Sequence, residues 1–588
     1  INYITDCDVI FSTGEFIIRD YMPVTHYAQR IFWIILSLYS LLGMHFFMHN
    51  QGGAGLYLPF NMVGWAFVSV LISIGIWHLT VVKQLTFSRT QLWFLAGFAI
   101  LLLPFLNPQA EWNTQAQPRF LAIAAGLLLF FALSQFQFTE QQRHSLLYLL
   151  LGAIAIEAVY GFVQFFVLKD GNWLGYNVKV NRPYGIFQKD TVFSSFLAVG
   201  IALSFYLQRW DISFDSSKWK KLLINFVLFS ATFLLVQVQS RAGVYGGILV
   251  ALVFFFFFWM FNKRLFWSSF LLVFFGLFFA WMFFHSARGE TESYYMNAFY
   301  RTVYWKQVLE MFSDAPFLGY GYGGFEYNFL HAYRAPGVPS VDYDPIGNAL
   351  DHPHNEVMFW LLEGGLIAVI GLMVFATGYI RSVLKCNGWA KRLSLLALVL
   401  PLLFHSMVEY PFYHSVAHFF LFIVFLWLAD AESGLQKVYA CRYWFLARVI
   451  AIIIPLIVVP FMLTGLQAAY VLTKYDRMKD KNPQMLEQII NPLPWMMMYE
   501  FQMRSVQLTF SAAMHDKAGL ESYVDWAKEF LHNTPRAVVY GRLAYVLQLL
   551  NDKEQAQFWL DEGKRLFPRD EFLQKMSLSS GSVVSGAK

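Results

Sequence analysis

Residues 351–380 read DHPHNEVMFWLLEGGLIAVIGLMVFATGYI, a polar opening followed by an apolar run over 356–380. A run of this length crosses a bilayer, which takes roughly 20 residues. Similar runs recur along the chain, so the sequence predicts an all-α polytopic membrane protein with about 13 transmembrane helices. The expected spans lie near 31–48, 61–80, 92–106, 119–136, 145–168, 190–207, 222–239, 243–261, 265–284, 356–380, 393–410, 415–429 and 448–470.

Composition supports the membrane assignment. The 588 residues are 57% hydrophobic and 14% charged, whereas a soluble chain carries about 25% charged residues. The formal charge of +5 is concentrated in loops, and no segment resembles a nucleic-acid-binding module. The widely spaced cysteines, Cys7, Cys386 and Cys441, follow no disulfide or metal-binding pattern, so we expect neither a metal site nor a cofactor.

Lysine and arginine are enriched in every second loop, and such loops face the cytoplasm. The opposite, outer side then holds residues 285–355 and everything after the last span. This pattern predicts a chain divided into an N-terminal segment 1–30, transmembrane helices over 31–284, a large outer loop 285–355, transmembrane helices over 356–470 and an outer helical domain 471–588. Residues 1–21 are polar and precede Met22, so we expect them to lie outside the native chain.

The expected outer domain contains helical hairpin signals. Two amphipathic stretches flank the turn Asn551-Asp552, with Ala544 and Ala556 at the expected helix crossing and Pro568 closing the unit. This arrangement resembles a tetratricopeptide-type hairpin. Residues 517–535 offer a similar helix that ends in Asn533-Thr534-Pro535. We interpret this region as a docking platform packed on the membrane domain.

The polar opening of the run at 356–380 is a candidate for chemistry. Pro353 is suited to the first helical position, which would place His354 in the first turn of the following helix. A helix N-terminus disfavours an imidazolium, so a histidine there stays neutral and available as a base. The alternative is that these polar residues only cap a helix at the membrane surface.

Two arginines are expected on the same outer side. Arg241 lies between two apolar runs with almost no loop, where an arginine either pairs with an anion or extends to the lipid headgroups. Arg301 lies in an amphipathic segment. Its alternative interpretation is a solvated charge on the surface of an interfacial helix. Guanidinium groups bind phosphate bidentately, and a neutral histidine beside them can accept a proton from a hydroxyl. This set suits transfer from a lipid-linked phosphate donor.

Three stretches resemble the superfamily of O-antigen ligases, O-antigen polymerases (the Wzy C-terminal superfamily) and bacterial O-oligosaccharyltransferases. They are Ser240-Arg241-Ala242, residues 301–305 followed by 316–321, and residues 352–356 followed by Glu363-Gly364-Gly365-Leu366. The PglL-type branch of pilin-glycosylating enzymes is favoured by His-Pro-His-Asn-Glu and by Glu409-Tyr410-Pro411. A C-terminal domain of this size also fits that branch.

The resemblance implies a multi-pass protein of the Gram-negative inner membrane, with the active site and the C-terminal domain in the periplasm. Its donor would be an undecaprenyl-pyrophosphate-linked oligosaccharide, and no metal would be needed. The essential histidine of the family falls on His354, and its phosphate-binding arginines fall on Arg241 and Arg301. Donor- or acceptor-binding roles fall on Gln164 and Tyr410, and we add Arg182, His352 and Glu356 to that group.

These secondary candidates have alternatives in ordinary packing. Gln164 in an apolar run also suits an interhelical hydrogen bond, and Tyr410 also suits a membrane interface, where aromatic residues are enriched. After the stretch 182–187, relatives continue with a Gln-x-Asn type segment, whereas this chain has Gln188-Lys189-Asp190. We therefore select Arg182 rather than Lys189 as a pyrophosphate contact.

The resulting hypothesis is a membrane glycosyltransferase that moves a preassembled glycan to a Ser or Thr hydroxyl of a pilin or another periplasmic protein. The closest alternative is an O-antigen ligase acting on lipid A-core, followed by an O-antigen polymerase. A transporter or flippase explains the spans, but it leaves the histidine and arginines on one face unexplained.

Overall fold

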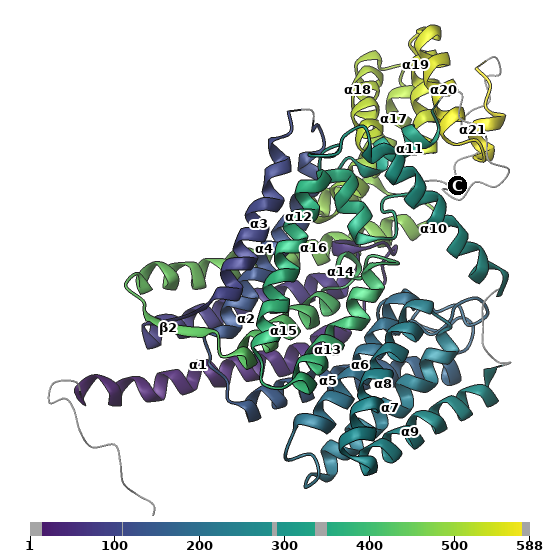
Figure 1. Cartoon of the computed structure of the whole chain (residues 1–588). Coiled ribbons are helices and arrows are strands. Elements are labelled where there is room, and N and C mark those ends of the chain that lie inside the picture. Colours follow the sequence, from purple (N-terminus) through teal and green to yellow (C-terminus); the bar gives the residue numbers. More distant parts are fainter. Residues whose placement is uncertain (1–14, 109, 285–290, 336–349, 579–588) are drawn as a thin grey trace, which may run out of the picture.

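The computed structural model describes residues 15–108, 110–284, 291–335 and 350–578. Long helices dominate it, as the apolar runs predict (Figure 1). The helices of the membrane domain are α1 (Glu15–Leu41), α2 (Pro59–Val82), α3 (Arg89–Leu102), α4 (Asn113–Ser134), α5 (Glu140–Phe162), α6 (Asp190–Trp210), α7 (Lys218–Val238), α8 (Arg241–Phe261), α9 (Lys263–Met282), α12 (Glu356–Lys385), α13 (Trp389–Ser406), α15 (Val416–Ser433) and α16 (Trp444–Arg477).

Among the described residues, 12 helices are long and apolar enough to span a membrane. The all-α polytopic fold is therefore confirmed. The remaining expected span, 393–410, corresponds to α13, which is not among the 12 and packs against α6 and α8. The first helix also differs from the expected span at 31–48, because α1 begins at Glu15 and ends at Leu41. Residues 1–14 lie outside the described part of the chain.

A short two-stranded ribbon departs from the purely helical expectation. Strands β1 (Gln84–Ser88) and β2 (Gln436–Ala440) pair antiparallel, with Thr86 opposite Val438. The amide of Gln135 bonds both backbone groups of Thr86, each at 3.0 Å. The ribbon joins two of the basic loops that the charge pattern assigns to one side, so these loops lie at the same end of the helices.

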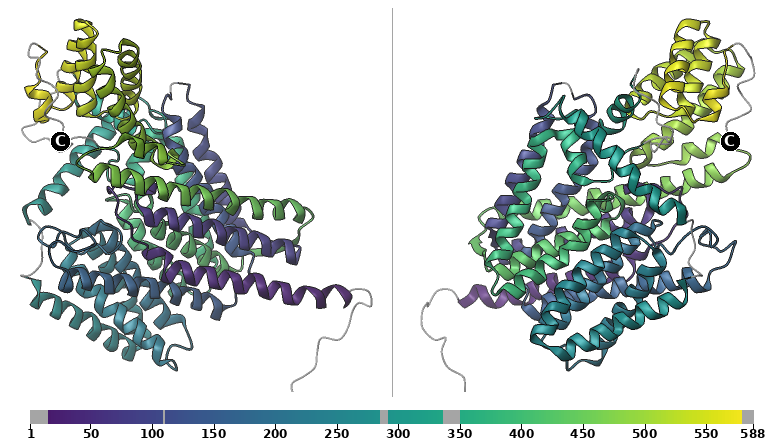
Figure 2. Two further views of the ribbon diagram at one scale, coloured as in Figure 1. Left: turned by 180° about the vertical axis from the view of Figure 1, so that it is seen from behind. Right: turned by 45° about the vertical axis from the view of Figure 1, so that its right-hand side comes forward.

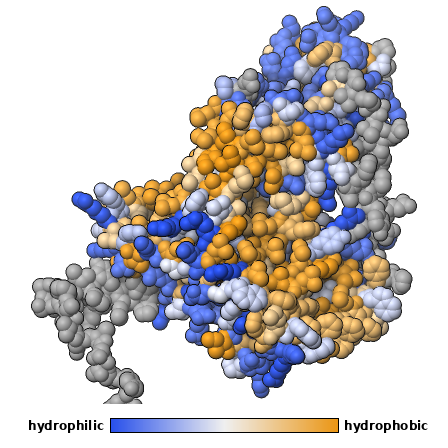
Figure 3. Space-filling view, in the orientation of Figure 1, coloured by the Kyte–Doolittle hydropathy of each residue, from blue (hydrophilic) through white to orange (hydrophobic). Residues whose placement is uncertain are grey.

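The expected loop 285–355 contains two helices, α10 (Thr291–Phe312) and α11 (Phe325–Tyr333). They lie between the membrane helices and the C-terminal helices, which gather at one end of the molecule (Figures 1 and 2). The space-filling view shows the same division, with apolar surface over the membrane helices and polar surface over the C-terminal end (Figure 3).

The C-terminal region consists of α17 (Met496–Ala513), α18 (Lys517–Asn533), α19 (Ala537–Leu549), α20 (Lys553–Leu566) and α21 (Glu571–Lys575). The expected hairpin is present, since α19 and α20 flank Asn551-Asp552 and α18 ends at Asn533. The region packs on α11 and on the start of α4: Arg536 pairs with Glu326 of α11, and Trp112 Nε1 donates to the carbonyl of His532 at 2.8 Å.

Helix α12 is broken at Gly365, which has φ 63° and ψ −160°. The carbonyls of Leu362 and Glu363, which lose their helical partners there, accept hydrogen bonds at 2.9 Å from the amides of Tyr320 and Gly321. The loop between α10 and α11 therefore supplies the hydrogen bonds that the broken helix lacks. Backbone polar groups at membrane depth need such partners.

We expect Gly365→Ala to destabilise the fold by about 2 kcal/mol or more, because left-handed strain costs about 1–3 kcal/mol. In addition, the new Cβ would meet the backbone carbonyl of Phe317. Gly388→Ala is the matched control, since Gly388 has φ +80° but nothing within 4 Å of its Cβ position. Thermal unfolding of the purified protein measures both, and equal losses would show that the close approach at Gly365 contributes nothing.

Candidate active site

Three polar side chains from distant parts of the chain meet at Glu409, which lies in the connection between α13 and α14 (Pro411–His414). The Glu409 carboxylate lies 2.9 Å from Lys189 Nζ, 3.1 Å from Arg301 Nη2 and 3.0 Å from His354 Nδ1. The carboxylate is largely buried, while the histidine is about a quarter exposed. One acid is thus shared by two permanent cations and an imidazole.

His354 precedes helix α12, so the expected position in its first turn is wrong. Asn355 is the N-cap, and its Oδ1 accepts from the Met358 amide at 3.0 Å. Asparagine is a preferred N-cap, which moves the helix start to Glu356. His354 adopts φ 55°, a left-handed conformation that is uncommon outside glycine and recurs at functional sites. Its ring is therefore aimed by the turn and not by the helix.

His352 supports this turn from within the protein. Its Nδ1 accepts the backbone N–H of His354 at 2.9 Å, which leaves the proton of a neutral ring on Nε2, 3.5 Å from the Glu356 carboxylate. Glu356 in turn accepts from Trp360 Nε1 at 2.8 Å and from the Tyr413 hydroxyl at 2.7 Å. His352 does not cap the helix, because Asn355 does so, and His352 instead holds the backbone of His354.

Tyr410 packs against both histidines. Its ring centroid lies 4.9 Å from that of His352 and 5.7 Å from that of His354, and Lys189 Nζ is 4.3 Å from it. Burial raises the pKa of Tyr410, so its phenol stays protonated. The residue therefore forms one wall of the cluster, and its donor- or acceptor-binding role stays a prediction.

Lys189 reaches the site because it directly precedes α6 and is fixed by the loop before it. Gln164 organises that loop: its Oε1 accepts the amides of Tyr184 and Gly185 at 2.9 Å, and its Nε2 donates to the Gly185 carbonyl. Gln164 is buried, and its hydrogen bonds position the loop that precedes Lys189. Arg182 belongs to the same loop, and its positive charge favours the ionised form of the Asp190 carboxyl.

Arg241 is the first residue of α8, at the end of the helices where α6 also begins. The first turns of α6 and α8 touch, since a Cβ at Gly243 would meet the side chain of Ser194. The ring of Tyr245, one turn after Arg241, lies 6.1 Å from that of Phe404 near the end of α13. Arg241 is half-buried and lies at the end of α8 that adjoins the start of α6 and the end of α13.

Buried hydrogen bonds connect α6, α13 and α15 next to the cluster. Ser195 of α6 places its hydroxyl 2.7 Å from His405 Nδ1 on α13 and 3.0 Å from His418 Nε2 on α15. All three side chains are fully buried. The carbonyl of His405 also accepts the Glu409 amide at 2.8 Å. These contacts fix Lys189 and Glu409 relative to each other.

The cluster holds Glu409 ionised. Burial by itself raises the pKa of Glu409, but the contacts with His354 and Lys189 outweigh it and hold the pKa well below the usual carboxyl range. For Lys189, burial lowers the pKa, and the facing Glu409 raises it above the ordinary value. Glu409 is therefore a carboxylate and Lys189 an ammonium, and Asp190 is a second acid beside Lys189.

This linkage predicts an acid-sensitive fold. A carboxyl whose pKa is lower in the folded chain than its unfolded value of about 4.3 stabilises the fold above that pH, and the contribution is lost as the pH falls toward the folded pKa. We therefore expect thermal stability to decline below about pH 4 in the wild type and less steeply in Glu409→Gln. Unfolding midpoints across this range test it, and parallel curves would contradict it.

A second buried ion pair was not anticipated from the sequence. Arg119 of α4 pairs with Glu363 of α12. The other oxygen of Glu363 accepts the Gly323 amide at 3.0 Å, and the Arg119 guanidinium lies 4.6 Å from the Phe359 ring and 4.7 Å from the Trp360 ring. The pair connects α4, α12 and the glycine-rich loop behind the site.

The cluster around Glu409 combines a base with an anion-binding surface. The left-handed turn and the carboxylate direct the imidazole of His354. The 3.0 Å contact at Nδ1 is the distance of an ion pair, although the N–H is not well aligned with the oxygen. Such contacts often tighten only with substrate bound. The two cations beside this carboxylate, Lys189 and Arg301, favour a phosphate group.

No group of three or more His, Cys, Asp or Glu side chains within the described residues is placed to hold a metal ion. Fold and site together define a polytopic all-α membrane protein with a cationic, histidine-containing site at helix N-termini. Residues 226–373 match the family model described as O-antigen ligase, and residues 393–579 match that described as virulence factor membrane-bound polymerase, C-terminal. A comparison with curated proteins finds no match.

Each match covers less than half of the chain; together they show similarity to the O-antigen ligase superfamily and support glycosyl transfer of the ligase or polymerase type. The matched ranges contain Arg241, Arg301 and His354 in the first and Glu409 and Tyr410 in the second.

The structure brings Arg301, His352, His354 and Tyr410 to one cluster and places Glu356 and Gln164 in its support. Glu409 and Lys189 are the additions. The sequence patterns include Glu409 only as part of a motif, and they favour Arg182 over Lys189 as a pyrophosphate contact.

Proposed function

We propose that this chain is a protein O-oligosaccharyltransferase of the PglL type, which moves a glycan from undecaprenyl pyrophosphate to a Ser or Thr hydroxyl. The observation that carries the proposal is the contact of Glu409 with His354, Lys189 and Arg301. It combines a histidine directed by a carboxylate with cations suited to a pyrophosphate leaving group.

In the proposed reaction, Nε2 of His354 accepts the proton of the acceptor hydroxyl. The hydroxyl oxygen forms a bond to the anomeric carbon of the glycan as the bond from that carbon to the pyrophosphate oxygen breaks. Arg301, Arg241 and Lys189 neutralise the charge on the departing undecaprenyl pyrophosphate. The proton remains on His354 until it is released to solvent or product, and Glu409 stabilises the imidazolium in the meantime.

The C-terminal helices supply the argument for a protein acceptor. They share a hydrophobic core with α10, the helix that carries Arg301, and with the start of α12: Tyr304, Phe329 and Phe359 pack in one cluster with Tyr540 and Leu543. A helical domain built onto the active-site helices is suited to present a protein, whereas a glycolipid acceptor arrives through the membrane. The proposal places this domain and the site in the periplasm of a Gram-negative inner membrane.

The second candidate is transfer to another glycan, as in an O-antigen ligase or polymerase. The descriptions of both matched families favour it. The proton transfer and the leaving group are the same in that case, and only the acceptor differs. The C-terminal helices are therefore the feature that favours a protein hydroxyl over a sugar hydroxyl.

We expect glycan on the acceptor protein when the chain is co-expressed with a lipid-linked glycan and a candidate pilin in cells that also make lipid A-core. Intact-protein mass spectrometry of the pilin and gel analysis of the glycolipid measure the two products. A strain with His354→Ala supplies the background. Glycan found only on lipid A-core, or only as longer lipid-linked chains, would replace the proposed acceptor by a sugar.

A further inference from the structure

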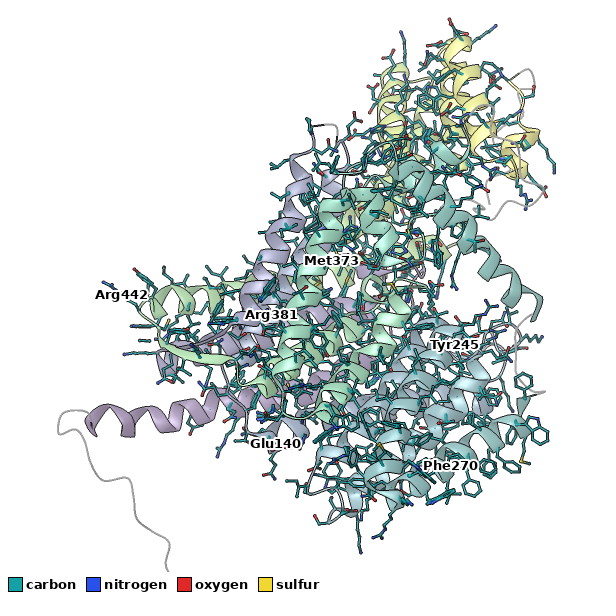
Figure 4. The ribbon with its side chains drawn as sticks, viewed as in Figure 1. Glu140, Tyr245, Phe270, Met373, Arg381 and Arg442 are labelled. Carbon is teal, nitrogen blue, oxygen red and sulfur yellow. The ribbon has the colours of Figure 1, made fainter. Side chains whose placement is uncertain are left out.

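A cavity of about 250 Å³ lies at the opposite end of α12 from His354, between the start of α3 and the end of α12. Its lining includes Arg89, Arg381 and Lys385, together with Trp93 and Leu384. Both helices are candidate membrane spans, so the cavity opens where these spans end. Arg381 is labelled in Figure 4, low on α12 beside the ribbon of β2.

The charges in this cavity lack the carboxylate partners that some other cations at this end have. Arg143 and Lys391 share Glu432 at 3.1 and 3.3 Å, and Lys220 pairs with Asp211 at 2.7 Å. In the described part of the chain, no carboxylate lies at ion-pair distance from Arg89, Arg381 or Lys385. The guanidinium of Arg381 instead lies 5.5 Å from the Trp93 ring. Like charges around one cavity repel, and an anion between them removes that cost.

An apolar track leads from the cavity along the helix surface. Met373 and Leu384 are 54% and 56% exposed and lie on the same face of α12 as Arg381 by helical periodicity. Figure 4 shows Met373 above Arg381 along this helix. Their separation of eight positions corresponds to about 12 Å along the helix. On α3, Leu92 and Leu95 are likewise exposed. A polar patch at the end of α12 borders this apolar surface in Figure 3.

We propose that this cavity binds the phosphodiester headgroup of an anionic phospholipid, whose acyl chains lie along the exposed faces of α3 and α12. The three cations bind the phosphate, and Trp93 lies at the headgroup level, where aromatic residues are enriched. A lipid is favoured over a free anion because the apolar track continues from the cavity toward the middle of the span. The site is separate from the Glu409 cluster and does not depend on the proposed function.

The test compares lipids on the full-length protein in detergent micelles. Adding phosphatidylglycerol should raise the unfolding midpoint by about 3 °C relative to phosphatidylcholine. Arg381→Gln with Lys385→Gln should abolish that difference. The matched control, Lys263→Gln with Arg264→Gln, removes the same charge from the exposed first turn of α9 and should retain the difference.

Three results would overturn the proposal. If both double variants lose the lipid-dependent difference in unfolding midpoint equally, the effect comes from net charge. If sodium phosphate stabilises the protein as much as phosphatidylglycerol does, the site binds a free anion and not a lipid. If the Arg381/Lys385 variant does not fold, native mass spectrometry of the wild type decides. Bound phosphatidylglycerol should then exceed phosphatidylcholine from an equimolar mixture by about tenfold, as a binding difference of about 1.4 kcal/mol gives. No preference would contradict the site.

Discussion

Replacing His354 by alanine is expected to lower glycan transfer by about 10²–10⁴-fold, the usual contribution of a positioned general base, while the chain still folds and inserts. The reason is the geometry at Glu409: Nδ1 of His354 faces the carboxylate at 3.0 Å, which leaves Nε2 as the nitrogen that can accept a proton. Initial rates with a lipid-linked glycan and an acceptor protein in proteoliposomes measure the effect.

The unusual backbone of His354 requires a control for strain. His515 has φ 53°, close to the 55° of His354, and is exposed between α17 and α18. His515→Ala therefore introduces alanine at the same left-handed conformation without touching the site, and it should keep full activity. His354→Asn adds a second comparison, because asparagine tolerates this conformation. Full activity in both His354 variants would move the base to another residue.

The membrane helices follow from the sequence because each span carries its own signal. An apolar run that is long enough to cross a bilayer has few structures open to it, so positions such as 356–380 are predicted within a few residues. The break of α12 at Gly365 is different. Paired glycines indicate weak helix propensity, but the loop around Tyr320 that completes the broken bonds is a tertiary contact that no local pattern contains.

The site illustrates the same limit. Lys189 and Glu409 are separated by 220 residues, and only the packing of α6 against α13 brings them together. Family resemblance led to Arg301 and His354, and it did not identify the acid between them. The pair of Arg119 and Glu363 did leave a signal: each is a lone charge in an apolar run. Because such charges are costly in a membrane, opposite lone charges are candidates for pairing.

Removing Glu409 and removing Arg301 should both impair transfer, but in different ways. Glu409→Gln takes away the group that directs His354 and stabilises its protonated form, so we expect kcat to fall by about 10²–10⁴-fold. The cations remain, and without their carboxylate partner they are freer to bind the donor pyrophosphate. The KM for the lipid-linked donor should therefore stay unchanged or decrease.

Arg301→Gln removes a cation that acts on the leaving group, and we expect a loss of about 10²–10³-fold in kcat/KM with an increase in the donor KM. Lys306→Gln is its control, since Lys306 lies on the same helix, is largely exposed and pairs only weakly with Glu310 at 3.7 Å. Donor titrations at saturating acceptor separate the two constants. A donor KM that rises in Glu409→Gln as it does in Arg301→Gln would mean that Glu409 serves only to hold the cations in place. In that case the Glu409 carboxylate would not be needed to orient His354, and the left-handed turn alone would orient its imidazole.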